Sequence, residues 1–503
     1  MFRIFGPPGT GKTTTLLNMV DKAFESGVQP QEIAFLAFTK KAATEAKERA
    51  ADRFGLDPKE DLMFFRTLHS LALAMTDIQS DQIMQREHYK ELSHAIGVEL
   101  FGQNQIDDDF IELAKTTDPL LGLINLARLR KVDLRQQYNE SELETDWNTV
   151  RYVDESLRKY KKMYKLHDFT DMLELFVHQA PTFKHRFKVT FLDEAQDLSP
   201  LQWDIAHILD GMSDKMYCAG DDDQAIYRWA GADVDHFINL DGGSEILETS
   251  FRIPQEIHNV AENISKRISR RFPKRYNPKA DCGKVLRVST IDGVDMAEGS
   301  WLILSQAGYQ LTPVAKDLKS NGYLFNYRGH RSISEKVADA VNGWEALRKG
   351  REVSGKTARN IYSFMSAKDR ITRGFKKLPA LLDEDLVDLN TLIADHGLNA
   401  DKEMIWHVAM DKLPEQDRAY IIALLRRGEK FNGEPRITVS TIHGSKGGEA
   451  DNVVLFTDLS PAAEKAARNN PDDLHRVFYV GVTRARENLF IVEPEDVARS
   501  YEL

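Results

Sequence analysis

The octapeptide GPPGTGKT, residues 6–13, follows the short apolar run FRIF and precedes a segment with helical spacing, residues 14–26. Its glycine and lysine spacing is that of a phosphate-binding loop between a strand and a helix. The glycines let backbone N–H groups turn towards phosphate oxygens, and the helix adds its positive N-terminal end. The pattern therefore predicts a site for ATP and Mg²⁺ formed by Gly6, Pro7, Pro8, Gly9, Thr10, Gly11, Lys12, Thr13 and Thr14. We expect Lys12 to reach the β and γ phosphates, and Thr13 to bind Mg²⁺.

A second motif, FLDE at residues 191–194, ends an apolar run in two adjacent carboxylates. Asp193 is expected to hold Mg²⁺ through its hydration shell, and Glu194 to act as the general base that polarises the attacking water. An apolar run ending in two acids is common in α/β proteins. Its pairing with the phosphate-binding loop is what predicts ATP hydrolysis.

The apolar runs divide the chain into two α/β regions. The first region has runs at residues 2–5, 33–38, 189–192 and 215–219. Because a strand, a helix and a strand follow one another, we expect a parallel sheet with functional residues at the carboxyl ends of its strands. Residues 80–165 and 334–433 have a helical pattern instead. The second region has runs at 285–289, 301–304, 323–326, 437–440, 453–457 and 489–492.

The composition excludes several other classes of protein. The 503 residues carry a net charge of −11, which argues against a chain that coats nucleic acid by bulk charge alone. Two isolated cysteines make neither a metal cluster nor a disulfide framework. No window approaches the length of a membrane span, and no signal-peptide pattern is present, so we expect a cytoplasmic protein without membrane association.

Eight segments in a fixed order carry a family resemblance. They are AFTKKAATEAKER (37–49), FRTLHSLA (65–72), HDFTDML (167–173), LDEAQDLSPLQW (192–203), AGDDDQAIYRWAGA (219–232), LETSFRIP (247–254), ITVSTIHGSKGGEADNVVLF (437–456) and VFYVGVTRARENLFIV (477–492). In this order they resemble the motifs of the UvrD/Rep/PcrA group of superfamily-one DNA helicases, over nearly the whole chain.

The resemblance implies an α/β fold of two RecA-like P-loop domains with parallel sheets, each interrupted by a mainly helical insertion. On this basis residues 1–79 and 166–245 form RecA-like domain 1A, and 80–165 form the helical insertion 1B. Residues 246–333 and 434–503 form RecA-like domain 2A. Residues 334–433 form insertion 2B, which is shorter than in the larger members of the family.

The resemblance also implies roles in catalysis. Arg252 and Arg484 match the family's two arginines that stabilise charge on the γ-phosphate, and Gln224 matches the residue that senses this phosphate. Glu449 matches the residue that contacts the ribose. The other interpretation is that each arginine lies at the surface and pairs with an acid. The expected catalytic set is Lys12, Glu194, Gln224, Arg252 and Arg484.

Single-stranded DNA is held by stacking on aromatic rings and by phosphate contacts. Trp229 is the best candidate for stacking, whereas Tyr227 and Phe38 are equally compatible with a core position. The predicted DNA-binding residues are Phe38, Thr39, Thr67, His69, Tyr227, Trp229, Thr441 and His443. Many relatives have an arginine after this tryptophan, whereas this chain has Ala230, so the local contact is expected to differ.

Two charged segments have alternative interpretations. Asp221 and Asp222 are expected to be solvated turn residues, and Asp223 to belong to the network of Gln224. The basic run formed by Lys266, Arg267, Arg270, Arg271, Lys274 and Arg275 is either a phosphate track or a solvated helix face.

Together these features predict an ATP-dependent DNA helicase that moves 3′ to 5′ on single-stranded DNA and unwinds duplex. Its expected partners are single-stranded DNA, junctions of single and double strands, and a protein loader or a replication or repair partner. It is expected to be a monomer or to self-associate weakly. One alternative is a translocase that remodels protein–DNA complexes with little unwinding. Another is a non-motor P-loop protein, which residues 247–254, 437–456 and 477–492 argue against. RNA remains open as the track.

Overall fold

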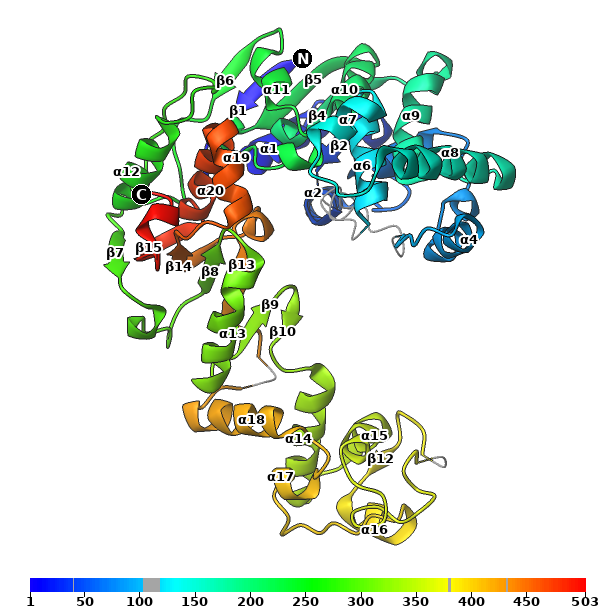
Figure 1. Cartoon of the computed structure of the whole chain (residues 1–503), viewed down its shortest axis with the longest axis vertical. Helices are drawn as coiled ribbons and strands as arrows, with labels where there is room; N and C mark the ends of the chain where they lie inside the picture. Colours follow the sequence, from blue (N-terminus) through cyan, green and yellow to red (C-terminus); the bar gives the residue numbers. More distant parts are fainter. Residues whose placement is uncertain (39, 103–117, 379–380, 431–432) are drawn as a thin grey trace. The chain divides into compact units, whose positions relative to one another are not determined.

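The computed structural model describes residues 1–38, 40–102, 118–378, 381–430 and 433–503 (Figure 1). The described chain forms two compact units, each built from two segments of sequence. The first comprises Met1–Gly283 and Lys465–Thr483, and the second comprises Lys284–Glu464 and Arg484–Leu503. Each unit contains a sheet whose strand pairs are parallel or nearly all parallel, which confirms the predicted α/β fold class.

The sheet of the first unit has six strands in the order β3-β2-β4-β5-β1-β6, and every pair is parallel. These strands are β1 (Phe2–Phe5), β2 (Ile33–Ala37), β3 (Phe65–Thr67), β4 (Phe187–Leu192), β5 (Ser213–Gly220) and β6 (Ser244–Ile246). The strand order places β4 and β1 on either side of β5, so the carboxyl ends of these strands meet at one edge.

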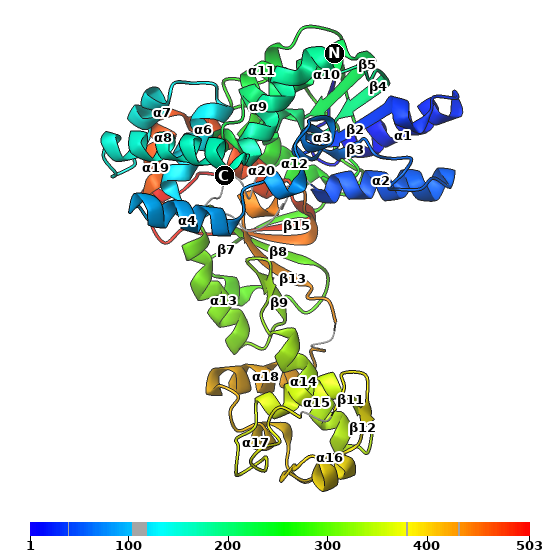
Figure 2. The same cartoon turned by 90° about the vertical axis from the view of Figure 1, so that its right-hand side faces the viewer.

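The residue pattern explains why this sheet is covered on both faces. All five residues of β2, IAFLA, are buried, as expected for a central parallel strand. In one hydrophobic core of the first unit, Phe35 and Phe191 of the sheet pack together with Leu16 of α1 (Lys12–Glu25) and Ala46 of α2 (Lys40–Phe54). Figure 2 shows α1 and α2 side by side next to β2 and β3.

The other helices of the first unit lie between and after the strands. They are α3 (Leu68–Met75), α4 (Arg86–Ile96), α6 (Pro119–Leu129), α7 (Leu134–Glu140), α8 (Trp147–Tyr164), α9 (Phe169–Gln179), α10 (Pro200–Gly211), α11 (Val234–Asn239), α12 (Gln255–Ser265) and α20 (Pro471–Val482). Within residues 80–165 the described part is helical, as the sequence predicts. It has its own core, in which α4, α6 and α8 pack together through residues such as Leu92, Ile124 and Val153.

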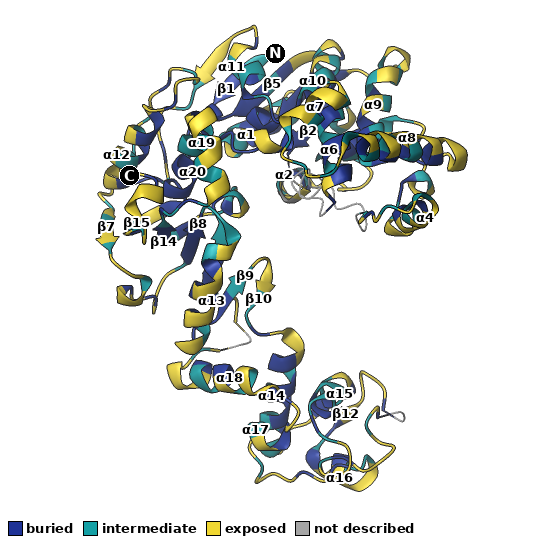
Figure 3. Ribbon diagram, viewed as in Figure 1, coloured by how far each residue is buried: buried dark blue, intermediate teal, exposed yellow. Residues whose placement is uncertain are grey.

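The second unit has a seven-stranded sheet in the order β10-β9-β13-β8-β14-β15-β7, in which the β9–β10 pair alone is antiparallel among the described strands. These strands are β7 (Lys284–Val288), β8 (Trp301–Ser305), β9 (Phe325–Tyr327), β10 (His330–Arg331), β13 (Ile437–Thr441), β14 (Ala450–Phe456) and β15 (Ala485–Val492). Figure 3 shows the central strands of this sheet as buried.

The helices of the second unit are α13 (Leu311–Ser320), α14 (Glu335–Arg348), α15 (Gly355–Ser363), α16 (Leu389–Asp395), α17 (Trp406–Ala409) and α18 (Glu415–Arg427). The helix α19 (Pro461–Asn469) contains the boundary between the two units and leads into α20. One hydrophobic core runs from Ile303 and Val439 in the sheet to Trp344 in α14 and Ile421 in α18.

Several short strands are absent from the sequence prediction. β3 and β6 have three residues each and lie at the two edges of the first sheet, and β10 has two. The predicted helical stretch 334–433 also contains the antiparallel pair of β11 (Val353–Ser354) and β12 (Leu386–Val387). The division of the chain into domains 1A, 1B, 2A and 2B stays a prediction. In the described part of the chain, no helix combines the length and the apolar character that crossing a membrane requires.

Candidate functional site

The phosphate-binding loop joins β1 to α1 in the first unit. Gly9 and Gly11 have φ angles of 71° and 79°, a region in which a side chain is strained, so glycine suits both positions. A Cβ atom on Gly6 would lie 1.9 Å from Cγ of Lys12, so glycine is required where this lysine folds back over the loop. The ammonium of Lys12 donates a hydrogen bond to the carbonyl of Gly6 at 2.8 Å. The loop therefore presents a positive charge where a phosphate group would be received.

The two carboxylates that follow β4 lie directly beside this loop. The hydroxyl of Thr13 donates to Oδ2 of Asp193 at 2.5 Å, and Nζ of Lys12 lies 4.0 Å from Oε1 of Glu194. Burial and the neighbouring Glu194 carboxylate raise the pKa of Asp193 to about 6. The hydroxyl and carboxylate oxygens of Thr13 and Asp193 are the hard ligands that Mg²⁺ prefers, so these residues fit the predicted metal.

Gln196 connects the general-base candidate to the next strand. Its side-chain nitrogen donates to Oε2 of Glu194 at 2.6 Å, and its oxygen accepts the backbone N–H of Asp221 at 3.0 Å. A Cβ atom on Gly220 would lie 2.5 Å from that oxygen, which explains the glycine at the end of β5. The sequence gives no specific signal for this role beyond the position of Gln196 two residues after Glu194.

The acidic residues after β5 are buried, so the expectation that Asp221 and Asp222 are solvated is wrong. Nζ of Lys274 lies 3.2 Å from Asp221, 2.6 Å from Asp222 and 2.8 Å from Asp223. Arg271 also binds Asp223, at 2.6 Å. Buried carboxylates require such cations, and these come from about 50 residues later in the chain. Gln224 donates to Oδ2 of Asp221 at 2.6 Å, which joins it to the same cluster.

The six cations of the basic run at residues 266–275 do not lie in one environment. The helix α12 ends at Ser265, so the run follows a helix and does not form one of its faces. Lys274 is buried in the acidic cluster, and Arg270 pairs with Asp235 at 2.8 Å. Arg271 is also engaged by Asp223, so two of the six cations are directed into the protein.

Arg252 lies next to the phosphate-binding loop within the first unit. Ser250 donates through its hydroxyl to the carbonyl of Pro8 at 2.8 Å, and the N–H of Phe251 donates to the carbonyl of Gly9 at 2.9 Å. A Cβ atom on Gly9 would lie 2.3 Å from Cβ of Arg252. The segment that carries Arg252 is thus packed against the loop.

Arg484 and Glu449 belong to the second unit. The guanidinium of Arg484 is buried and donates to the carbonyl of Gly448 at 3.1 Å, next to Glu449. Glu449 is exposed and lies 3.7 Å from Arg486. Arg484 is therefore not the surface arginine of the alternative interpretation.

Three aromatic rings extend from β2 to the protein surface. Phe38 and Tyr227 are buried and stack with their ring centroids 5.8 Å apart, and the ring of Trp229 meets Tyr227 edge-on at 6.3 Å. Trp229 is 45% exposed and borders a cavity of about 550 Å³ that Arg130 and Arg228 also line. Of the three rings, Trp229 alone presents a large surface to a base.

The predicted phosphate contacts lie in different environments. Thr67 is buried and accepts the N–H of Ser70 at 3.3 Å as the N-cap of α3. His69 is buried, and burial lowers its pKa to about 4, so its ring is neutral at pH 7. In the second unit, Thr441 accepts the N–H of Gly444 at 3.1 Å, and His443 begins a 3₁₀ turn. Thr39 lies outside the described residues.

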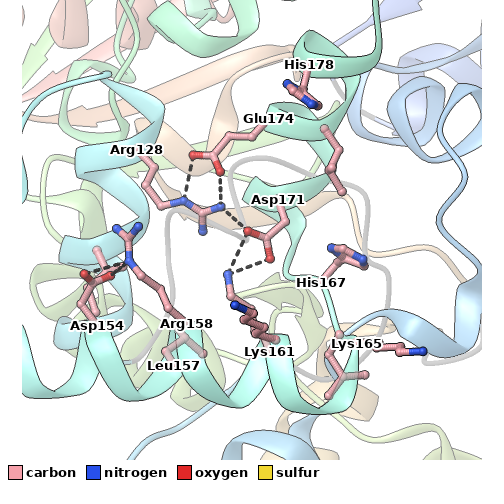
Figure 4. A pocket seen from close by; sticks show the side chains of 14 residues that line it. Arg128, Asp154, Leu157, Arg158, Lys161, Lys165, His167, Asp171, Glu174 and His178 are labelled. Atoms are coloured by element: carbon pink, nitrogen blue, oxygen red, sulfur yellow. Dashed lines mark hydrogen bonds and ion pairs between the residues drawn. The ribbon is translucent and has the colours of Figure 1, made fainter. Parts of the chain in front are cut away.

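The segment HDFTDML and the following Glu174 bind two cations, the partly buried Arg128 and the buried Lys161 (Figure 4). Arg128 of α6 lies 2.9 Å from Asp168, 2.5 Å from Asp171 and 2.8 Å from Glu174. Lys161 of α8 pairs with Asp168 and Asp171 at 2.5 and 2.7 Å. Burial raises the pKa of Asp168, but the two cations outweigh this effect and hold the pKa below its usual range. The cavity of about 710 Å³ beside this network is lined by none of the predicted nucleotide-binding residues. The ion pairs of the segment instead connect α6 and α8 to α9.

Two family models match the chain. The UvrD/REP helicase N-terminal domain matches residues 2–243, and the UvrD-like helicase C-terminal domain matches residues 136–495. A solved structure titled "The structure of PRRSV helicase" aligns at 13% identity with a TM-score of 0.32, covering 100% of this chain and 54% of that one. A likeness this low says nothing further about the fold.

Three curated relatives show the same relationship. "Putative ATP-dependent DNA helicase YjcD" of Bacillus subtilis is 27% identical over 46% of this chain and 31% of its own length. "ATP-dependent DNA helicase PcrA" of Leuconostoc citreum is 26% identical over 51% of this chain and 36% of its own. "DNA helicase II" of Rickettsia typhi is 22% identical over 98% of this chain and 90% of its own. The alignments thus span about a third of the first two relatives and most of the third. The family models, which together span residues 2–495, show that the chain belongs to the UvrD-like family of DNA helicases.

Proposed function

We propose that this chain is an ATP-dependent DNA helicase that translocates on single-stranded DNA from 3′ to 5′ and separates duplex at its junction with single strands. The observation that carries the proposal is a chain of contacts in the first unit. It runs from Lys12 to Glu194, Gln196 and Asp221, and then to Gln224. Gln224 lies five residues before the exposed Trp229. A nucleotide-sensing network is thus continuous with the element proposed to hold DNA.

The proposed chemistry uses residues of this loop and network. Lys12 binds the β and γ phosphates, Glu194 accepts a proton from the attacking water, and Gln224 responds to the γ-phosphate. Mg²⁺ held by Thr13 and Asp193 would neutralise charge on the phosphates. Arg252, packed against the loop, stabilises the charge that develops on the γ-phosphate. Arg484 and Glu449 keep the roles that the family resemblance implies.

The proposed DNA contact is centred on Trp229. Base stacking on an exposed aromatic ring is tolerant of sequence, which suits a protein that moves along a strand. The buried Tyr227 meets the Trp229 ring edge-on, and the buried Phe38 stacks on Tyr227. His69 is neutral at pH 7, so any phosphate contact it makes is a hydrogen bond and not an ion pair.

The test compares ATP hydrolysis with and without single-stranded DNA, and the unwinding of duplexes that carry a 3′ or a 5′ tail. We expect strong stimulation and opening of the 3′-tailed duplex only. Stimulation without opening would favour the translocase that remodels protein–DNA complexes. Absence of stimulation would contradict the motor function, and preference for an RNA strand would change the assigned track.

Two variants test the nucleotide site separately. Lys12→Ala and Glu194→Gln should each lower turnover by about 10²- to 10⁴-fold, while single-stranded DNA binding stays within about threefold. Lys188→Met is the matched control, because Lys188 lies on β4 but pairs with Asp214 at the surface, 3.0 Å away. Normal ATP hydrolysis by both site variants would refute the site assignment.

A further inference from the structure

Lys274 is an unusually placed lysine in the first unit. Its side chain is 1% exposed, and its ammonium is within 3.2 Å of the carboxylates of Asp221, Asp222 and Asp223. Burial disfavours the charged form, but the three carboxylates outweigh it and raise the pKa of Lys274, so the side chain remains an ammonium. The ammonium of Lys274 therefore neutralises buried carboxylates inside the protein and is not accessible to nucleic-acid phosphates.

The three aspartates differ in what else they contact. Asp223 has a second cation, Arg271, which approaches at 2.6 Å. Asp222 accepts the backbone N–H of Phe272 at 2.7 Å. Among the described residues, Lys274 is the one cation within 4.0 Å of Asp221. Oδ1 of Asp221 also accepts the backbone N–H of Asp223 at 3.2 Å, so Lys274 supplies the cation at an oxygen that the backbone already holds.

Asp221 in turn contacts both Gln224, the proposed γ-phosphate sensor, and Gln196, which binds the proposed general base. Its Oδ1 faces Lys274, and its Oδ2 accepts the side-chain amide of Gln224 at 2.6 Å. Its backbone N–H donates to Gln196, whose amide donates to Glu194 at 2.6 Å. A shift of Asp221 would therefore move the γ-phosphate sensor and the general base together.

We propose that Lys274 is a positioning residue for ATP hydrolysis, which orients Gln224 and Glu194 through Asp221 without touching the nucleotide. This inference rests on the proposed function of the nucleotide site. It assigns a role in this site to a residue 50 positions beyond Gln224, outside the eight segments that carry the family resemblance. Lys274 therefore affects the rate of hydrolysis rather than the binding of ATP.

The first experiment measures kcat and KM for ATP hydrolysis, and the affinity for a fluorescent ATP analogue, in the full chain with Lys274→Met. Displacement of reacting groups by about 1 Å can cost roughly 100-fold in rate, so we expect kcat to fall by about 10- to 100-fold. KM and analogue affinity should change less than about threefold, because Lys12 and the loop are untouched. Lys188→Met, the same substitution at a surface ion pair, should leave all three unchanged.

A second variant separates positioning from simple charge balance. Lys274→Met leaves three buried carboxylates with less compensation, so the double variant Lys274→Met/Asp222→Asn removes one of them. Burial raises the pKa of Asp222, and its side chain contacts neither Gln224 nor Gln196 among the described contacts, so it is the least costly carboxylate to neutralise. We expect the double variant to regain thermal stability while kcat stays low, and Asp222→Asn alone to retain near-normal kcat.

The outcomes distinguish this inference from the proposed function. A return of kcat together with stability in the double variant would overturn it, as would an equal loss of kcat and analogue affinity in Lys274→Met. If neither variant folds, Lys274 is required for folding and the positioning role is abandoned. Basal hydrolysis without DNA reports on Glu194 and Gln224 directly. A wild-type protein that hydrolyses ATP without stimulation by DNA would therefore refute the helicase proposal while still testing Lys274.

Discussion

Replacement of Gly9 by alanine should destabilise the first unit by separating the phosphate-binding loop from the segment that carries Arg252. Gly9 has a φ of 71°, and an added Cβ atom would lie 2.3 Å from Cβ of Arg252 and 2.8 Å from the hydroxyl of Ser250. Both distances are well inside van der Waals contact, and the first atom belongs to a short, rigid part of its side chain. The loop and residues 250–252 must therefore move apart.

The magnitude has two parts. The left-handed backbone conformation costs alanine about 1 to 2 kcal/mol, and forced overlap in a packed region costs a further 1 to 3 kcal/mol, roughly. Gly27→Ala isolates the first part, because Gly27 has a φ of 85° and an added Cβ atom would meet nothing within 4 Å. The midpoint of thermal unfolding without nucleotide should thus be about 2 to 10 °C lower for Gly9→Ala than for Gly27→Ala.

The contact itself is tested by repeating Gly9→Ala in a background with Arg252→Gly, which removes the Cβ atom it would strike. The part of the Gly9→Ala cost that exceeds the cost of Gly27→Ala should then fall by about half in urea unfolding, because the contact with Cβ of Arg252 is gone. The left-handed conformation and the contact with Ser250 remain. The packing of Arg252 against the loop is contradicted if Gly9→Ala lowers stability no more than Gly27→Ala does. It is also contradicted if Gly9→Ala lowers stability equally in the wild-type background and in the Arg252→Gly background.

Two further predictions concern the proposed DNA contact. Trp229→Ala should weaken single-stranded DNA binding by about 5- to 150-fold, the effect of losing one stacked base, with little change in thermal stability. Tyr227→Ala, at a position only 1% exposed, should instead cost about 3 to 5 kcal/mol of stability. If the two variants lose DNA affinity and stability to the same extent, the assignment of Trp229 to the DNA contact and of Tyr227 to the core is wrong. Burial lowers the pKa of His69 from 6.5 to about 4 in the folded protein. As the pH falls, this residue therefore binds a proton in the unfolded chain before it does so in the folded protein. Its contribution of about 3 kcal/mol is therefore complete above pH 6.5 and is lost as pH falls towards 4, so urea unfolding of His69→Asn should show a weaker pH dependence in this window than the wild type.

Long apolar runs were predictable from the sequence because they are local signals. The runs at 33–38 and 189–192 became β2 and β4, and the glycine-rich loop between β1 and α1 was recognised from its spacing alone. The edge strands β3 and β6 were not predicted, since FRT and SEI have no continuous apolar character. They are strands because a neighbouring strand supplies their hydrogen-bonding partners, which a short segment does not reveal.

The environment of a polar residue was harder to predict. A run of three aspartates is normally solvated, yet Asp221 and its neighbours are buried. Their counterions, Arg271 and Lys274, belong to a basic run that also looks solvated when it is considered alone. Each segment was misjudged because the free energy of a buried charge depends on a partner that is remote in sequence.

The sequence by itself determined the α/β class and the family, and it predicted the phosphate-binding loop and the pair of carboxylates, because each depends on residue types at short, fixed spacing. Only the tertiary structure decided that Trp229 is exposed while Tyr227 and Phe38 are buried, and that Arg252 packs against Gly9. It also decided that Lys274 lies among the aspartates. Burial and ion pairing depend on which distant segments the fold brings within a few ångströms, and spacing along the chain does not contain that information.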